Sequence, residues 1–128
     1  MTVRVVRLGS ARISSEGIRI GTVRHPPRGV PKSQHATQNW YDVWLPELAP
    51  STPLVKLALA ARSERQWGSF VRRYRAEMAA PEKAHILKLL AALSLASNFS
   101  VGCYCADESR CHRSVLRTLL KEHGARVD

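Results

Sequence analysis

The spacing of apolar and polar residues predicts a small α/β fold. Residues 3–8 (VRVVRL) and 17–24 (GIRIGTVR) are short, rich in β-branched residues and partly alternating, which is typical of strands. Residues 98–105 (NFSVGCYC) form a third strand-like run near the carboxyl end. Strands at both ends, with helices between and after them, favour a single-domain layered α/β fold in which helices flank a largely parallel sheet.

Three segments have the periodicity of amphipathic helices. The first begins at Ser63, which forms a capping-box pattern with Gln66. Its predicted apolar face consists of Trp67, Phe70, Val71, Tyr74 and Met78. The second begins at Pro81, and its predicted apolar stripe consists of Ile86, Leu89, Leu90 and Leu93. The third carries Val115, Leu116, Leu119 and Leu120 and ends at Gly124.

The segment between the second strand and the first helix lacks such periodicity. Its beginning, HPPRGVPK at residues 25–32, has three prolines and predicts a stiffened, basic loop. The residues that follow predict an ordered irregular connection, which Trp40, Tyr41 and Trp44 anchor to the core. A long connection of this kind is uncommon in a compact domain unless it borders a site.

Length and hydropathy predict one domain over residues 1–128. No apolar run approaches the roughly 18 residues that span a bilayer. Arg4 and Arg7 interrupt the first apolar stretch, unlike a secretory signal. We therefore expect a cytoplasmic protein with no membrane partner, whose three cysteines are reduced.

The formal net charge of +10 bears on the kind of ligand that the protein binds. Such a charge favours an anion, either a phosphate-bearing small molecule such as a nucleotide or a nucleic acid. It is also compatible with a basic surface that has no dedicated ligand, because net charge bears on solubility before it bears on function.

The segment VGCYCADESRCHRSVL, residues 101–116, contains all three cysteines of the chain. Strand geometry places Cys103 and Cys105 on one face, about 6.5 to 7 Å apart, where a disulfide would be strained. On the following helix, His112 shares the apolar face with Leu116 and is expected to point toward the sheet. Cys111 and Arg113 lie at the two edges of that face. The pattern thus predicts that Cys105, Cys111 and His112 meet beneath the first helical turn.

Three interpretations of this cluster stay open. As a thiol or anion site, Cys105 or Cys111 is a thiolate, His112 is its proton partner, and Arg113 binds a negative group. As a structural zinc site, the ligands are Cys103, Cys105, Cys111 and His112, although their spacing differs from paired C-x-x-C knuckles. As a packed junction, the cysteines are small core residues and His112 is a satisfied core histidine. The combination of residues favours the first interpretation.

Four stretches carry a resemblance to a known family: RHPPRGVPK, WLPELAPST, WGSFVRRYRAEM and CYCADESRCHRSVL. In order and spacing, the chain resembles the domain of unknown function 488 family, in its YeaO-like branch. The resemblance implies a small α/β domain and a site shared between the cysteine segment and the basic proline-rich loop. It implies no established activity. The matching positions are Arg24, Arg28, Gly29, Trp44, Leu45, Pro50, Tyr74, Cys111, His112 and Arg113.

We therefore predict one anion-binding crevice that contains thiols, with Asp42 or Glu47 as possible internal partners of Arg28 and Arg113. One side of the crevice is formed by Cys105, Cys111, His112 and Arg113, and the other by Arg24, Arg28 and Lys32. The ligand is a nucleotide, a nucleic-acid end or another phosphorylated compound, and catalysis stays open. The rival is a noncatalytic nucleic-acid-binding surface formed by Arg62, Arg65, Arg72 and Arg73.

Overall fold

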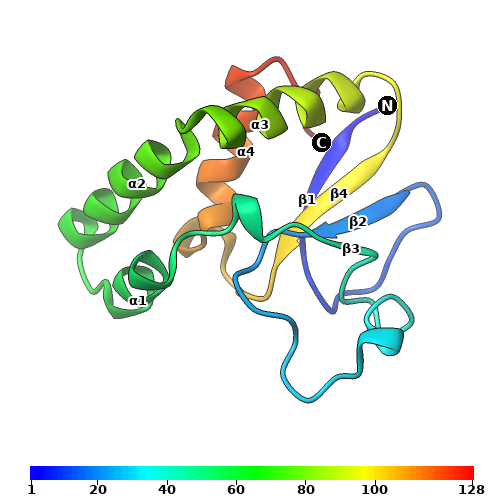
Figure 1. The fold of residues 1–128 in the computed structure, drawn as a ribbon, viewed down its shortest axis with the longest axis horizontal. Coiled ribbons are helices and arrows are strands. Elements are labelled where there is room, and N and C mark those ends of the chain that lie inside the picture. Colours follow the sequence, from blue (N-terminus) through cyan, green and yellow to red (C-terminus); the bar gives the residue numbers. More distant parts are fainter.

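The computed structural model describes all 128 residues. Its centre is one four-stranded parallel sheet (Figure 1). The strands are β1 (Val3–Arg7), β2 (Ile18–Gly21), β3 (Val43–Trp44) and β4 (Phe99–Cys103). Their order across the sheet is β1-β4-β2-β3, and every pairing is parallel. The predicted α/β class is confirmed, and the sheet is entirely parallel.

Four α-helices and three short 3-10 turns complete the fold. The helices are α1 (Thr52–Ala60), α2 (Glu64–Met78), α3 (Pro81–Ser94) and α4 (His112–Glu122). The 3-10 turns are Lys32–Gln34, Pro46–Leu48 and Glu108–Arg110. The start of α2 is as predicted, because the Ser63 side chain accepts a hydrogen bond from the Gln66 amide at 3.1 Å. Helix α1 and the two-residue strand β3 were not predicted.

The helices pack on one face of the sheet. Alternate strand residues such as Val3, Ile20 and Val101 point to this face and form its apolar core together with residues of all four helices. Phe70, Tyr74 and Met78 confirm the predicted face of α2.

The predicted stripe of α3 is wrong in part, because Leu89 and Leu93 are 65% and 40% exposed. The buried residues of α3 are Leu87, Leu90, Ala91 and Ser94. Helix α3 turns Ser94 inward because its hydroxyl accepts a hydrogen bond from the Arg126 amide at 2.9 Å.

Loops rather than helices cover the opposite face of the sheet. Arg19 of β2 is buried there and donates two hydrogen bonds to the Glu16 carboxylate, at 2.7 and 3.0 Å. The ring of Tyr41 lies against Gly21, where an added Cβ would come within 2.3 Å of a ring carbon. The absence of a side chain at Gly21 therefore allows the irregular connection to lie directly on the strand.

The carboxyl end of the chain returns to the sheet. Helix α4 is followed by Gly124, whose φ of +95° favours glycine, and Val127 then forms an isolated parallel bridge with Val3. None of the four helices combines the length and apolar character that crossing a bilayer requires.

Candidate functional site

A cleft of about 840 Å³ opens at the carboxyl ends of β1, β4 and β2. This is the edge at which parallel α/β sheets bind ligands. Arg7 ends β1, Cys103 ends β4, and the loop after β2 adds the prolines of HPPRGVPK. The lining also includes Trp40 and Tyr104, whose rings meet edge to face at 5.9 Å. The cleft therefore has both apolar walls and charged groups.

The charge of the cleft wall is entirely positive. Four arginines, Arg7, Arg24, Arg28 and Arg110, line the cleft, and none of its lining residues is acidic. Arg24 is engaged by the protein, since it donates to the carbonyl oxygens of Pro50 and Ala49 at 3.0 Å each. Arg28 is exposed and forms no ion pair or hydrogen bond within the chain. The wall thus carries a cation that is free to meet an anionic ligand.

The two acidic residues next to the cysteines turn away from the cleft. The carboxylate of Asp107 accepts a hydrogen bond from the Ser109 amide at 3.0 Å. Glu108 accepts two hydrogen bonds from Arg117, at 2.8 and 3.1 Å. Both carboxylates are therefore engaged inside the loop, and neither residue lines the cleft.

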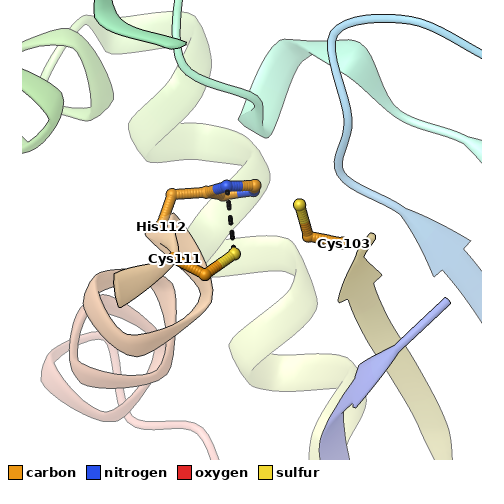
Figure 2. Close-up of side chains that lie close together, drawn as sticks. All are labelled: Cys103, Cys111 and His112. Carbon is orange, nitrogen blue, oxygen red and sulfur yellow. Dashed lines mark hydrogen bonds between the residues drawn. The ribbon is translucent and has the colours of Figure 1, made fainter. Parts of the chain in front are cut away.

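His112 begins α4 and points inward, as its position on the helix predicted. Its side chain is buried, and Nε2 lies 2.8 Å from the carbonyl oxygen of Thr22. A carbonyl oxygen only accepts, so Nε2 carries a proton. Nδ1 faces the Cys111 sulfur at 3.8 Å (Figure 2). The ring of Tyr74 packs edge-on against the imidazole at 5.6 Å. His112 is thus oriented as a proton partner of Cys111.

Cys103 and Cys105 approach each other more closely than a continuous strand allows. Strand β4 ends at Cys103, and the two sulfur atoms lie 3.9 Å apart. The Cys103 thiol donates toward Cys105, so hydrogen bonds from Cys103 and Cys111, with the charge of Arg113, lower the pKa of the Cys105 thiol. The same contact with Cys105 raises the pKa of Cys103. Cys105 is therefore the thiol of the cluster that ionises first.

The pKa of Cys111 is also lowered, first by its contact with Cys103 and then by the neighbouring His112, against an opposing contact with Cys105. It therefore belongs to the same set of thiols, which exchange protons with one another. Cys111 is buried at the start of α4 and lines the base of the cleft, whereas Cys105 is half-buried and lies at its wall.

Arg113 is buried beside the cysteines without an acidic partner. It is 3% exposed, donates to the Cys105 carbonyl oxygen at 2.6 Å, and its Nε has no hydrogen-bond partner. The predicted internal partners are wrong, because Asp42 pairs with Arg12 at 2.8 Å and Glu47 is exposed and pairs with neither Arg113 nor Arg28. No carboxylate lies within ion-pair distance of Arg113.

The structure brings together most of the residues that the sequence indicated. The cleft lining contains Cys105, Cys111, His112, Arg24 and Arg28. Arg113 contacts Cys105 from the protein interior and is not part of the lining. Lys32 lies in an exposed 3-10 turn outside the cleft.

Several residues of the site were not predicted, among them Arg7, Arg110 and Thr22. Arg7 had a signal, since it lies next to the carboxyl end of a predicted strand, and the carboxyl ends of parallel strands meet at one edge of the sheet. Arg110 and Thr22 had none, because their roles depend on how the loops fold. Arg110 pairs with Glu64 and lies 5.6 Å over the Trp67 ring.

The cluster also has the donor atoms of a metal site. The sulfur atoms of Cys103 and Cys111 and a ring nitrogen of His112 all lie within 4.8 Å of one another. Cys105 adds a third sulfur, next to Cys103. Thiolate and imidazole are ligands that zinc prefers, so these residues could hold such an ion.

These features define a class: a parallel-sheet α/β domain with a cysteine and histidine cluster at the carboxyl ends of its strands. Residues 3–124 match the family model described as "DUF488-N3a: Active DUF488-N3 subclade". The chain therefore belongs to the DUF488 family, as its four sequence stretches predicted, while the YeaO-like branch stays a prediction. No curated protein and no solved structure matches the chain.

Proposed function

We propose that the cleft binds a phosphate-bearing compound and that the Cys105 thiolate reacts with it as a nucleophile. The observation that carries this proposal is the buried guanidinium of Arg113, which lies beside Cys105 and has no carboxylate partner. If Cys105 were a neutral thiol, the positive charge of Arg113 would have no counter-ion, so the position of this guanidinium favours a thiolate at Cys105.

The energetic reason is the cost of burying a lone charge. An ion removed from water without a counter-ion costs several kcal/mol even after the protein relaxes. Arg113 forms one hydrogen bond to a neutral carbonyl, and its Nε is unpartnered. A thiolate at Cys105 supplies the missing negative charge, which favours the ionised form of that residue.

The anion specificity follows from the composition of the wall. Arg28 is free, no lining residue is acidic, and the planar guanidinium of arginine suits phosphate oxygens. The cleft volume falls within the usual range of about 300 to 1,000 Å³ for small-molecule sites. Trp40 and Tyr104 add aromatic surface on which a nucleobase can stack. A nucleotide or a nucleic-acid end therefore fits the wall better than free phosphate.

The chemistry assigned to the cluster is covalent catalysis. Cys105 attacks an electrophilic atom of the ligand, and the bond to the leaving group breaks as the bond to sulfur forms. His112 faces Cys111 rather than Cys105, so the pair of Cys111 and His112 is the candidate proton donor to the leaving group. The word "Active" in the description of the matching family model supports a site that does chemistry.

Thermal unfolding in the presence of nucleotides and pyrophosphate tests the binding step. Bound ligand raises the unfolding temperature. We expect this rise to be lost in Arg28→Ala and retained in Arg72→Ala, which removes the same charge from an exposed position on α2. An equal loss in both variants would show that overall charge, not the cleft, attracts the ligand. Mass spectrometry of the soaked protein then tests for an adduct at Cys105.

The exposed arginines on α2 and just before it favour a second candidate function, binding of nucleic acid without catalysis. The residues are Arg62, Arg65, Arg72 and Arg73; all are exposed, and none forms an ion pair. Binding that depends steeply on salt and is unchanged in Cys111→Ser and His112→Gln would support this candidate over the cleft.

A structural zinc ion is the competing use of the cysteine cluster. The close approach of the Cys103, Cys111 and His112 donor atoms favours it. Elemental analysis would then find one zinc ion per chain, and Cys111→Ser would lose both the zinc and the fold. That result would favour a structural ion over a nucleophilic thiolate.

A further inference from the structure

Cys103 is a thiol that the proposed chemistry does not use. It ends β4, is mostly buried, and points its sulfur toward Cys105 at 3.9 Å. A small apolar residue would pack equally well at this position, whereas a second thiol next to a nucleophilic one can form a disulfide with it. The remaining question is which event would join the two sulfurs.

We propose that Cys103 and Cys105 form a reversible disulfide when a hydroperoxide enters the cleft. The proposal shares the Cys105 thiolate with the proposed function, but it requires no substrate and no catalytic activity. Its ligand class is a small peroxide, and its site is the pair of sulfurs at the carboxyl end of β4.

The positions of the two sulfurs set the order of events. Cys105 is half-buried at the cleft wall, where an entering molecule meets it first. Cys103 is more deeply buried than Cys105, also lines the cleft, and lies within reach of the Cys105 sulfur, as a resolving thiol does. The Arg113 guanidinium beside Cys105 favours the thiolate, which is the form that reacts with peroxide.

The reaction balances in two steps. The Cys105 thiolate attacks one oxygen of the hydroperoxide, the O–O bond breaks, and the released alkoxide or hydroxide takes a proton from water. Cys105 is now a sulfenic acid. Cys103 then loses its proton and attacks the Cys105 sulfur, the S–O bond breaks, and hydroxide leaves with that proton as water. Two thiols are oxidised by two electrons, and the peroxide is reduced to an alcohol or water.

The short separation in sequence does not count against the bond. A continuous strand would hold the two residues apart, but β4 ends at Cys103 and the chain turns before Cys105. Strained disulfides have higher reduction potentials and are the labile ones, which suits a reversible state. Cys111 also contacts the Cys105 thiol, but its sulfur faces the His112 ring nitrogen at 3.8 Å as well, whereas the Cys103 thiol is directed at Cys105.

Trypsin distinguishes the possible products directly from the sequence. Cleavage after Lys88 and Arg110 gives one peptide, residues 89–110, that contains Cys103 and Cys105, whereas Cys111 falls in the tripeptide CHR. The purified chain, treated with chelator and then hydrogen peroxide, is alkylated and digested. We expect peptide 89–110 to be two hydrogens lighter and unalkylated. We also expect dithiothreitol to restore all three thiols.

Matched serine variants identify the resolving thiol. Cys111→Ser should keep the internal disulfide, whereas Cys103→Ser should lose it and leave Cys105 to over-oxidise to sulfinic acid. A main product that links peptide 89–110 to CHR, or three thiols that survive peroxide, would overturn the proposal even in the unmodified chain. If no disulfide forms but Cys105 is still alkylated selectively in the same sample, the disulfide proposal is wrong, while the Cys105 thiolate of the proposed function is retained.

Discussion

Two buried arginines, Arg19 and Arg113, differ in what surrounds them. Arg19 is fully buried, and its three side-chain nitrogens donate to the Glu16 carboxylate and to the carbonyl oxygens of Ser10 and Asn39. Arg113 is 3% exposed and makes one hydrogen bond, to a carbonyl oxygen. The first has the environment of a structural cation, with charge and donors satisfied by the fold.

The comparison distinguishes a buried arginine whose charge is balanced within the protein from one whose charge is not. Arg19 joins β2 to the two loops that replace helices on its face of the sheet, so its role ends within the protein. Arg113 lies beside Cys105 and has no carboxylate within ion-pair distance, and we propose that an ionised thiol or a bound anion supplies the counter-charge.

The largest effect is expected from Arg19→Met. Breaking the buried pair leaves Glu16 with the Ser100 hydroxyl and with Arg4, at 3.5 Å, as its one remaining ion-pair partner, so the free energy of unfolding should fall by about 3 to 5 kcal/mol. Urea denaturation measures the change. Adding Glu16→Gln should restore part of it, because the uncompensated carboxylate is then removed. A loss of less than about 1 kcal/mol would mean that Arg19 is not the structural cation described above.

The next effect is expected from Arg113→Met, on reactivity more than on stability. Without the guanidinium, the pKa of the Cys105 thiol should rise, so the pH at which alkylation of that residue falls to half of its plateau rate should shift upward. The readout is the rate of iodoacetamide labelling of peptide 89–110. Arg113→Lys, which keeps the charge, is the matched control. Equal rates in Arg113→Met and the unmodified chain would remove the link between this arginine and the thiolate.

A smaller effect is expected at the free cation of the cleft. Arg28→Ala should weaken binding of a nucleotide about three- to tenfold, the usual value of one exposed charge contact. Arg72→Ala should change the affinity by less than about twofold, because solvent and salt screen a charge that lies outside the cleft. Isothermal titration at constant salt compares the two. Affinities that fall together would place the ligand on the general basic surface instead.

The smallest change is expected from pH itself. Because the folded chain lowers the pKa of Cys105 below its ordinary 9.0, the thiolate is present at neutral pH and is lost only in acid. Labelling of Cys105 should therefore vary less than about twofold between pH 8 and 6, whereas in the unfolded chain it should fall about a hundredfold. Stopped-time alkylation at each pH measures this. Parallel profiles in the two states would show an ordinary thiol.

The sequence predicted the parts of the fold that depend on local periodicity. The strands of residues 3–8 and 17–24 and the start of α2 at Ser63 are signalled by their own residues, and each is present. Helix α1 was missed because Pro50 and Pro53 lie just before it and in its first turn, and because its apolar residues are not confined to one face. The stripe of α3 was misplaced because Ser94, a polar residue, faces inward to bind a distant backbone amide.

The site was predictable only where residues are neighbours in sequence. Helical spacing was enough to turn His112 inward and to place it near Cys111. No local pattern shows that Glu108 pairs with Arg117, or that Asp42 pairs with Arg12 rather than with Arg113. The Arg12–Asp42 pair joins residues 30 positions apart in the chain, so it depends on the assembled fold.

One contact, between the His112 ring and the carbonyl of Thr22, has a consequence of its own. The acceptor belongs to the main chain of the segment that follows β2, so no exchange of side chain at residue 22 can delete it. Which nitrogen of the imidazole holds hydrogen is thus decided by the architecture of the sheet. If residue 111 is substituted, His112 therefore keeps the same tautomer, and the lone pair on its Nδ1 still points toward the new side chain at residue 111.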